Sequence, residues 1–193
     1  MLAYLNSSAK VSVRAKYDVT AKSYDELYRD EQYSKYEVIV KKGLYPTNND
    51  RVLDAGCGTC LLYEYFNEMG LIPQYYVGLD VSIGMLNLCL DKNVIPNPKV
   101  DLIQADIEYI PFREESFNKI YVITVLDLIE NKENTLMNLE NLLKDNGILV
   151  YTLLKQRNCL PGIEPDNVKD CIYVKRKEGV TKKPYINKVD LFE

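Results

Sequence analysis

Between residues 51 and 154 the chain alternates short apolar runs with segments in which apolar residues recur at helical spacing. The runs are only a few residues long and mostly apolar, as strands covered on both faces are. Such alternation is typical of βαβ units around a parallel sheet. We therefore predict an α/β fold with a doubly wound, mostly parallel sheet, helices on both faces, and strands at 51–55, 75–80, 100–105, 119–124 and 147–154.

Three helices are predicted between these strands. The first spans 61–69, and the second spans 83–92 behind Ser82, a residue type that caps helices well. Leu136, Leu139 and Leu143 recur at three and four residues, which places them on one face of a third helix. Because Asn146-Gly147 favours the left-handed conformation, we predict that the third helix ends there.

The two ends of the chain show different patterns. Residues 15–42 are rich in tyrosine and charge, and the spacing of the tyrosines predicts a helical cover. Residues 171–177 and 185–192 are interpreted as a terminal strand pair. Since no internal repeat or long linker marks a second unit, we predict one domain over 1–193, divided into an N-terminal cover (1–45) and a catalytic core (46–193).

The composition is that of an ordinary globular chain. Of its 193 residues, 47% are hydrophobic and 27% are charged, and no apolar run reaches the ~18 residues that a membrane-spanning helix needs. The first residues, MLAYLNSSAK, lack the cationic region and the long apolar stretch of a signal or transit peptide. We therefore expect a soluble, cytoplasmic protein without a membrane partner.

The net charge of −4 is unevenly distributed, because the middle of the chain is acidic and the C-terminal strip is basic. The cations of this strip are Lys175, Arg176, Lys177, Lys182 and Lys183. A basic strip can contact phosphate, but such runs are more often solvated surface. The sequence therefore permits RNA binding without indicating it.

Five cysteines and no histidine limit the chemistry that the chain can perform. An odd number of cysteines without a secretion signal indicates reduced thiols, and we interpret Cys89, Cys159 and Cys171 as small apolar residues. Cys57 and Cys60 form a single C-x-x-C pair, so no structural zinc site is expected. The absence of histidine excludes Ser-His hydrolases and histidine-ligated metals, and no metal ligands are predicted.

The strongest motif lies at 52–60, where a buried strand ends in Asp54 and a turn that contains Gly56 and Gly58. Glycine in such a turn lets the backbone approach a ligand closely. A dinucleotide-binding turn needs a third glycine at the next motif position, where this chain has Leu61. Asp54 would also repel a pyrophosphate, whereas it suits a cofactor that carries an ammonium and a sulfonium.

Two further strands also end in a carboxylate. Asp80 closes the strand at 75–80, at a distance from the glycine turn that fits an acceptor for the two hydroxyls of a ribose. Asp106 follows the strand at 100–105. Because open α/β sheets bind ligands at the C-terminal ends of parallel strands, we expect the three carboxylates to line one crevice.

These motifs, in this order, resemble those of the class I S-adenosylmethionine-dependent methyltransferases, and the similarity extends from Tyr17 to Leu154. Residues 117–126 match the fourth motif of that family, and the tyrosines of the cover resemble those of its type 11-like members, which modify quinones and tRNA. The resemblance implies a seven-stranded sheet, S-adenosyl-L-methionine as cofactor and S-adenosyl-L-homocysteine as product.

The resemblance also implies roles for the motif residues. Asp54 would bind the ammonium of the methionine part, and Asp80 would accept both ribose hydroxyls. Asp106 would accept from the adenine amino group, and Ile107 would offer its backbone N–H to the ring. The cofactor contacts implied in this way are Tyr17, Tyr24, Asp54, Ala55, Gly56, Gly58, Asp80, Val81, Met85, Asp106, Ile107 and Thr124.

The sequence departs from the family pattern at two positions. Cys60 stands where many members have a third glycine, and Leu128 replaces a histidine that is common after the fourth strand. No Asn-Pro-Pro-Tyr or Pro-Cys run follows that strand, which argues against methylation of adenine N6, a glutamine amide or cytosine C5.

Methyl transfer from a sulfonium is an in-line displacement with a neutral leaving group. It needs no general acid, and positioning of the reactants supplies most of the rate. If the acceptor is an amine or a hydroxyl, Asp127 or Tyr24 is the predicted catalytic base. Asp127 also has a simpler interpretation as a carboxylate at the start of a helix.

The sequence leaves three functions open. The preferred hypothesis is methylation of a macromolecule, RNA or protein, because the short region after Leu154 leaves little chain to enclose a small substrate. Analogy with relatives of this size adds a small zinc-binding activator protein as a partner. The alternatives are a small-molecule methyltransferase acting on a quinone-like or biosynthetic intermediate, and a cofactor-binding protein that has lost catalysis.

Overall fold

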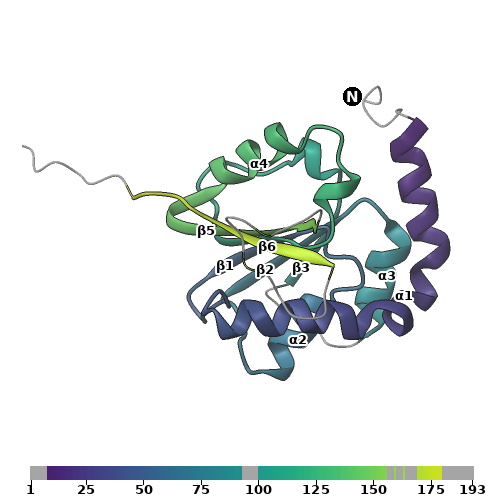
Figure 1. The fold of residues 1–193 in the computed structure, drawn as a ribbon, viewed down its shortest axis with the longest axis horizontal. Helices are drawn as coiled ribbons and strands as arrows, with labels where there is room; N and C mark the ends of the chain where they lie inside the picture. The colour runs from purple at the N-terminus through teal and green to yellow at the C-terminus, as the bar shows by residue number, and fades with distance from the viewer. Residues whose placement is uncertain (1–7, 93–99, 156–158, 160–162, 164–168, 180–193) are drawn as a thin grey trace, which may run out of the picture.

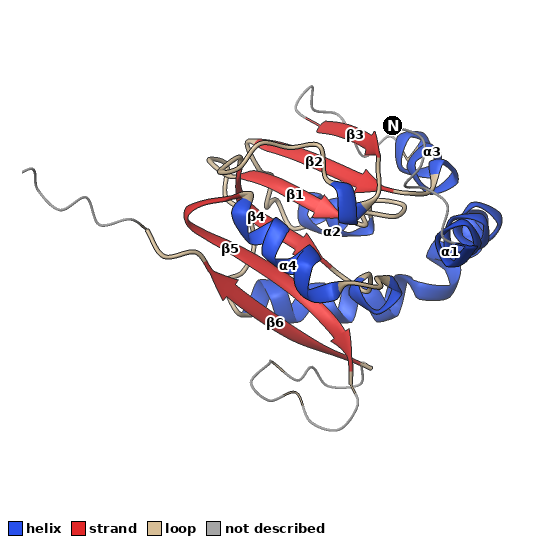
Figure 2. Ribbon diagram, turned by 90° about the horizontal axis from the view of Figure 1, so that it is seen from above, coloured by secondary structure: helices blue, strands red, loops and turns tan. Residues whose placement is uncertain are grey.

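The computed structural model describes residues 8–92, 100–155, 159, 163 and 169–179, with side chains from Val11 onward. It contains one mixed sheet, whose strands are β1 (Arg51–Ala55), β2 (Tyr75–Asp80), β3 (Val100–Gln104), β4 (Phe117–Val122), β5 (Leu143–Leu154) and β6 (Asp170–Arg176). Their order in the sheet is β3-β2-β1-β4-β5-β6, and every neighbouring pair is parallel except β5 and β6 (Figure 2). The predicted fold class is confirmed, with six strands instead of seven in the described part of the chain.

The bounds of most predicted strands agree with the sheet to within two residues. β1 and β2 have the predicted bounds, β3 ends one residue earlier than predicted, and β4 begins two residues earlier. β6 covers most of the first strand of the predicted terminal pair. The second strand of that pair, 185–192, lies outside the described residues.

The predicted end of the third helix is wrong. The helix, α4 (Lys132–Asn141), stops before Leu143, which is fully buried as the first residue of β5 and pairs with Phe117. Asn146 does adopt the left-handed conformation, with φ at 61°, but it does so inside β5, where the pairing with β4 shifts register. Burial of Leu143 against the sheet therefore outweighs the local preference for a helix, and the left-handed residue accommodates a strand irregularity.

The next two helices lie close to their predicted positions. α2 (Leu61–Glu68) and α3 (Ile83–Asp91) each end one residue before the predicted bound. Ser82 caps α3 as predicted, because its Oγ accepts a hydrogen bond from the backbone N–H of Met85 at 3.2 Å. No helix among the described residues has the length and apolar character that crossing a bilayer requires.

The predicted helical cover is α1 (Ser8–Lys41). Its first part stands beside α3, and its second part runs along the sheet face beside α2 (Figure 1). Asp18 ties α1 to α3, because its Oδ1 accepts hydrogen bonds from Ser82 Oγ at 2.5 Å and from the N–H of Gly84 at 3.1 Å. Arg29 ties α1 to α2 through a salt bridge with Glu64.

The sheet has an apolar core on each face, since successive side chains of a strand point to opposite sides. In β1, for example, Val52 packs in the core under α1, α2 and α3, and Leu53 packs in the core under α4. Figures 1 and 2 show these helices on the two faces of the sheet. With both faces covered, a ligand site is expected at the C-terminal strand ends.

The prediction of reduced thiols is wrong for four of the five cysteines. Cys60 forms a disulfide with Cys89, and Cys159 forms one with Cys171, with Cα–Cα distances of 5.3 Å and 5.2 Å. The partners are 29 and 12 residues apart in sequence, and only the fold brings them within bonding distance. Cys89, Cys159 and Cys171 are therefore buried cross-links instead of apolar fillers, and Cys57 is a free, buried thiol.

Candidate functional site

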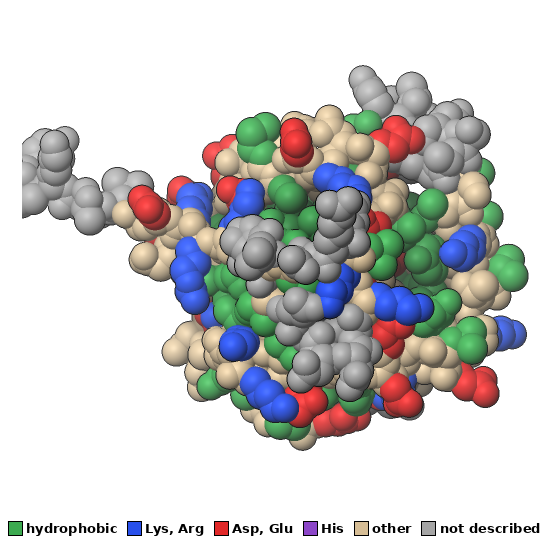
Figure 3. Space-filling model, viewed as in Figure 1, with side chains coloured by type: hydrophobic (Ala, Val, Ile, Leu, Met, Phe, Trp, Pro, Cys, Tyr) green, Lys and Arg blue, Asp and Glu red, His purple; other side chains and the backbone are tan. Residues whose placement is uncertain are grey.

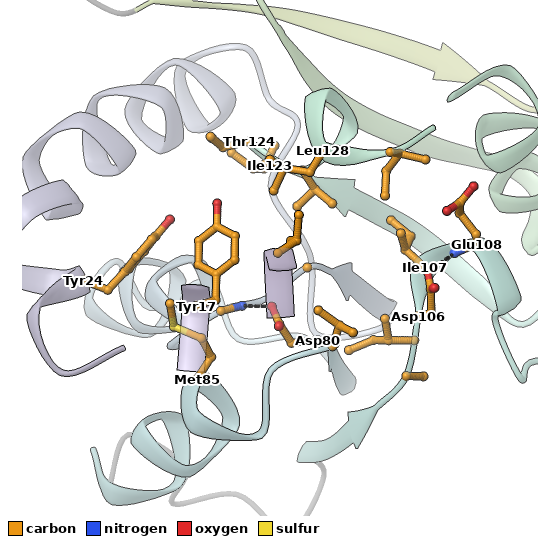
Figure 4. A pocket seen from close by; sticks show the side chains of 18 residues that line it. Tyr17, Tyr24, Asp80, Met85, Asp106, Ile107, Glu108, Ile123, Thr124 and Leu128 are labelled. Carbon is orange, nitrogen blue, oxygen red and sulfur yellow. Dashed lines mark hydrogen bonds between the residues drawn. The ribbon is translucent and has the colours of Figure 1, made fainter. Parts of the chain in front are cut away.

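A cavity opens at the C-terminal ends of β1, β2, β3 and β4, the edge at which open α/β sheets bind ligands. Tyr17 and Tyr24 lie on one side of it, Asp106 and Ile107 lie on the other, and Asp80 lies between them (Figure 4). The cavity brings together ten of the twelve predicted cofactor contacts, namely Tyr17, Tyr24, Gly56, Gly58, Asp80, Val81, Met85, Asp106, Ile107 and Thr124.

The glycine turn after β1 uses both glycines at positive φ, 92° for Gly56 and 52° for Gly58. A Cβ at Gly56 would lie 2.2 Å from Cγ2 of Val125, so the close packing of the turn on the segment after β4 requires glycine. A Cβ at Gly58 would meet nothing within 4 Å, because this residue faces open space at the cavity. The first glycine therefore serves packing, and the second exposes backbone to a ligand.

Asp80 occupies the middle of the lining with its carboxylate fixed in place. Its Oδ2 accepts from the N–H of Gly58 at 2.9 Å, and its Oδ1 accepts from the N–H of Ser82 at 2.8 Å. Burial raises the pKa of Asp80, and the hydrogen bonds from these two N–H groups oppose that shift. Each carboxylate oxygen keeps a lone pair with which it can accept from a ligand hydroxyl.

Asp54 and Ala55 are the two predicted contacts that do not line the cavity. Asp54 is only 3% exposed, and the hydroxyl of Tyr76 donates to its Oδ2 at 2.5 Å. Burial raises the pKa of Asp54 to about 7, the hydrogen bond from Tyr76 opposes the shift, and the nearby charge of Asp80 adds to it. Asp54 is therefore a buried carboxyl below the glycine turn, whose charge can change near neutral pH.

Tyr17 and Tyr24 belong to α1 and place aromatic rings at the cavity. Their ring centroids are 6.3 Å apart in an edge-to-face arrangement, and the ring of Tyr28 lies 4.9 Å from that of Tyr24. Burial is the main cause that raises the pKa of Tyr24 well above its usual value, and the neighbouring Tyr17 and Asp80 add to the shift. Both phenols are thus held in the protonated form, as hydrogen-bond donors.

Asp106 follows β3 and begins the short 3-10 helix η1 (Ile107–Tyr109). Its Oδ1 accepts from the N–H of Glu108 at 2.9 Å, which orients the carboxylate at the helix start (Figure 4). Ile107 is buried and lies next to Asp106 in the lining. The two residues together present a carboxylate and an apolar surface on one side of the cavity.

Asp127, one of the two predicted bases, is not part of the lining. It belongs to the 3-10 helix η2 (Leu126–Leu128), where its Oδ1 pairs with Lys132 Nζ at 2.7 Å. Its Oδ2 accepts from the N–H of Leu154 at 2.8 Å. Both oxygens therefore hold η2 against β5 and α4, and of the two predicted bases the cavity contains only Tyr24.

Eight lining residues were not among the predicted contacts. Most of them directly precede or follow a predicted contact at a strand end, and that adjacency was the signal for them. Val13, Leu128 and Ile129 had no such signal, because none of them adjoins a predicted cofactor contact. The eight residues are Val13, Leu79, Ala105, Glu108, Ile123, Val125, Leu128 and Ile129.

The fold and this site define a methyltransferase domain. A family model with that description matches residues 53–151, a segment that contains the glycine turn, Asp80, Asp106 and Thr124. The match covers more than half of the chain. The protein therefore belongs to this methyltransferase domain family.

Two curated relatives resemble the chain over most of its length. An uncharacterized protein of Methanocaldococcus jannaschii is 32% identical over 149 residues, which are 75% of this chain and 52% of the relative. A phthiotriol/phenolphthiotriol dimycocerosates methyltransferase of Mycobacterium ulcerans is 27% identical over 149 residues, which are 77% of this chain and 53% of the relative. The chain thus spans about half the length of these relatives.

Two solved structures share the fold. Magnesium protoporphyrin IX methyltransferase from Synechocystis, with bound S-adenosylmethionine, has a TM-score of 0.67 at 14% identity and covers 90% of this chain and 99% of its own. A putative methyltransferase of Haloferax volcanii, in complex with its Trm112 activator, has a TM-score of 0.64 at 18% identity, over 73% of this chain and 60% of that one. At these identities the likeness concerns the fold alone.

Proposed function

We propose that the protein binds S-adenosylmethionine in the cavity and transfers its methyl group to an acceptor at the cavity mouth. The observation that carries the proposal is the carboxylate of Asp80, held in the middle of the lining by the N–H groups of Gly58 and Ser82. Two oxygens fixed in this way can accept hydrogen bonds from the two neighbouring hydroxyls of a ribose.

The charge of the lining also supports this cofactor. Asp80, Asp106 and Glu108 line the cavity, and no Lys or Arg is among the described lining residues. Asp54 adds a fourth carboxyl just below the glycine turn, near enough to interact electrostatically with Asp80. Such an environment favours a ligand with a sulfonium and an ammonium over one with a pyrophosphate.

Each part of the cofactor has residues that fit it. Asp80 would hold the ribose, Asp106 and Ile107 would hold the adenine, and the open backbone at Gly58 would admit the methionine part. The bound cofactor supplies an electrophilic methyl carbon and a neutral leaving group. The residues of the chain then orient the acceptor in line with that carbon. Orientation of this kind can lower the activation barrier by roughly 7 to 11 kcal/mol.

Tyr24 contributes to this reaction as a hydrogen-bond donor at the cavity. Its raised pKa makes the phenolate rare at neutral pH, so Tyr24 is a poor general base. The rings of Tyr17 and Tyr24 also present aromatic surface, which favours a cation nearby. We therefore propose that orientation of the acceptor and electrostatics accelerate methyl transfer, and that proton transfer to Tyr24 does not.

The lining supports a small apolar acceptor over RNA. Val13, Leu128 and Ile129 add apolar side chains to the lining, and Leu128 is 40% exposed. On the face seen in Figure 3, cationic side chains are scattered among apolar and acidic ones. Two cations of the basic strip are also paired, Lys175 with Glu140 and Lys177 with Glu115, which weakens the case for a phosphate-binding surface.

Calorimetry tests the cofactor. We expect binding of S-adenosylmethionine and S-adenosylhomocysteine and no binding of nicotinamide dinucleotides. In Asp80→Ala the ribose hydroxyls lose their acceptors, and the affinity is expected to fall by about ten- to a hundredfold. Asp91→Ala, which removes an exposed carboxylate from the far end of α3, is the matched control and is expected to bind like the wild type.

Transfer of a labelled methyl group tests the acceptor. The labelled cofactor is incubated with the protein and with separated lipid-soluble, small polar, protein and RNA fractions of a cell extract. Label in the lipid-soluble fraction supports the apolar acceptor, whereas label in RNA or protein rejects it in favour of a macromolecule. Tight cofactor binding without label in any fraction would instead indicate a binding protein that has lost catalysis.

The predicted activator protein is a separate part of the proposal. The Haloferax methyltransferase that shares this fold was solved with its Trm112 activator. Co-expression of the chain with a Trm112-type protein and size-exclusion chromatography tests the partnership. Elution of both chains in one peak is the expected result, and separate elution would reject the partner.

A further inference from the structure

A buried ion pair joins α1 to β6 beside the cavity. Lys35 on α1 is fully buried, and its Nζ lies 2.7 Å from Oδ2 of Asp170, which is 2% exposed. Glu31, one turn earlier on α1, also pairs with Lys35 Nζ at 3.0 Å. Replacing a buried ion pair by apolar residues often leaves stability unchanged or raises it, so stability alone does not explain this pair.

The ion pair converges on the side chain of Thr124, directly after β4. Lys35 Nζ donates to Thr124 Oγ1 at 2.9 Å, and Gln32 Nε2 donates to the same oxygen at 3.2 Å. The hydroxyl of Thr124 lies 3.2 Å from Asp170 Oδ2, as does the hydroxyl of Thr152. The backbone N–H of Thr124 donates to Thr152 Oγ1 at 2.7 Å. Residues from α1, β5 and β6 thus hold one threonine by its side chain and its backbone.

The backbone of Thr124 needs such support. Its φ is 61°, in the left-handed region, which β-branched residues rarely adopt. A conformation of this kind persists only when the surrounding structure determines it, and it occurs preferentially at ligand sites. Here the hydrogen bonds to Lys35, Thr152 and Asp170 hold the backbone of Thr124 in this conformation.

Thr124 and its two neighbours form a wall of the cavity. Ile123, Thr124 and Val125 all belong to the lining, and Figure 4 shows Ile123 and Thr124 across from Asp80. Val125 also packs on the glycine turn, since a Cβ at Gly56 would lie 2.2 Å from its Cγ2. A shift of residues 123–125 would therefore displace this wall and the glycine turn together.

We propose that Lys35 and Asp170 are positioning residues that hold Thr124 in its left-handed conformation and thereby set the wall 123–125 against the cofactor. Neither residue lines the cavity, so both act through Thr124. The effect on the cofactor rests on the proposed binding of S-adenosylmethionine. The effect on the conformation of the wall does not depend on any ligand.

Two substitutions of Thr124 separate its hydroxyl from its shape. Thr124→Val keeps the branched shape but removes the acceptor for Lys35, whereas Thr124→Ser keeps the hydroxyl. We expect Thr124→Ser to bind S-adenosylhomocysteine within about twofold of the wild type, and Thr124→Val to bind about tenfold more weakly or worse. Equal affinities of the two variants would overturn the proposal.

A charge-free variant separates positioning from stability. In Lys35→Met with Asp170→Leu, both charges are removed, so the melting temperature is expected to stay near that of the wild type. The affinity for S-adenosylhomocysteine is expected to remain about tenfold reduced or worse, because Thr124 has lost Lys35 and Asp170 as partners. Recovery of the affinity together with the stability would mean that the pair is merely structural and would reject the proposal. If this variant does not fold, the two Thr124 variants still decide.

Hydrogen exchange of the protein without ligand distinguishes a failure of this inference from a failure of the proposed function. The amides of 123–125 are expected to exchange faster in the charge-free variant and in Thr124→Val than in the wild type, with α4 unchanged as the internal reference. Unchanged exchange at 123–125 would reject the positioning role. Faster exchange there, in a protein whose wild type binds no S-adenosylmethionine, would leave the positioning role standing and reject the cofactor.

Discussion

Gly56 and Gly58 stand two positions apart in one turn, yet the structure gives them different tasks. Both have positive φ, but a Cβ would collide with Val125 at Gly56 and would meet nothing within 4 Å at Gly58. The family motif alone treats the two glycines as equivalent. Their difference emerges only from what faces each of them.

Alanine substitutions separate these tasks. We expect Gly56→Ala to lower the free energy of unfolding by about 2 to 4 kcal/mol, through the collision with Val125 and an unfavourable φ. Gly58→Ala pays only the cost of its φ, about 1 to 2 kcal/mol, but its methyl group points into the space proposed for the cofactor. Denaturant unfolding and calorimetry with S-adenosylhomocysteine check this pair. A Gly58→Ala protein with unchanged affinity would contradict the assignment of Gly58 to the methionine part.

The buried carboxyl of Asp54 makes stability depend on pH. Its pKa in the folded protein is about 7, above the ordinary value of 3.8. Because the folded state binds this proton more tightly than the unfolded state, the resulting stability is fully present below pH 3.8 and is lost as the pH rises through 7. Tyr76, which donates to Asp54, does not remove this dependence.

Asp54→Asn tests the pH dependence with nearly unchanged shape. The amide oxygen can still accept from Tyr76, but the group no longer ionises. Between pH 4 and pH 8, the free energy of unfolding of the wild type is expected to fall relative to that of the variant. Urea unfolding at a series of pH values measures the difference, and parallel curves for the two proteins would refute the raised pKa.

At the residue scale, the sequence predicted the strand-end residues well and the buried partners poorly. Asp80 and Asp106 reach the cavity because Asp80 is the last residue of β2 and Asp106 lies two residues beyond the end of β3. Asp54 does not reach it, because the register places Asp54 opposite Gly78, two residues before Asp80. Lys35 could not be predicted as a partner of Thr124, since nothing in the local pattern indicates which distant segments meet.

The bounds of a helix or strand were predicted correctly where the sequence pattern fits only one kind of element. β1 and β2 are mostly apolar strands in the interior of the sheet, and both matched their predicted bounds. The boundary between α4 and β5 was wrong, because Leu143 fits the helical spacing but is buried in the sheet. Where helix and strand patterns overlap, tertiary burial decides, and a periodicity argument cannot weigh it.

The disulfide between Cys60 and Cys89 cross-links two elements of the site. Cys60 ends the glycine turn at a left-handed φ of 62°, and Cys89 lies on α3, which also carries the lining residue Met85. Many members of the family have glycine at the position of Cys60, whereas this chain combines a non-glycine residue at left-handed φ with a covalent restraint. The disulfide therefore fixes the glycine turn relative to α3.

Removal of this cross-link is expected to affect both stability and binding. Cys60→Ala with Cys89→Ala opens a 29-residue loop and should lower the free energy of unfolding by about 3 to 4 kcal/mol. The affinity for S-adenosylhomocysteine should fall as well, because the turn is released. Cys159→Ala with Cys171→Ala, which removes a cross-link between two residues that do not line the cavity, is the control that should lose stability alone. Titration of five thiols instead of one in the denatured, unreduced wild type would contradict both disulfides.

At the scale of the whole molecule, α1 connects the site to the rest of the fold. It contributes Val13, Tyr17 and Tyr24 to the lining, and Lys35 to the ion pair with Asp170. The alternation of strands and helices was sufficient to predict the sheet and its covered faces. It could not predict that one helix reaches both the cavity and β6, because that depends on the path of α1 across the molecule.

A ligand that contacts α1 and the strand ends at once should tighten the two together. We expect S-adenosylmethionine at a hundred times its Kd to stabilise the protein by about 2.7 kcal/mol, which corresponds to a rise in melting temperature of roughly 5 to 10 °C for a chain of this size. Hydrogen exchange should slow in α1 around Tyr17 and Tyr24, while α4, on the opposite face of the sheet, should stay unchanged. In Asp80→Ala, with its affinity lowered ten- to a hundredfold, the stabilisation at the same concentration should fall to about 0.4 to 1.4 kcal/mol, and the slowing of exchange should weaken with it. Slowing confined to the strand ends, with α1 unaffected, would show that the helix does not close on the cofactor.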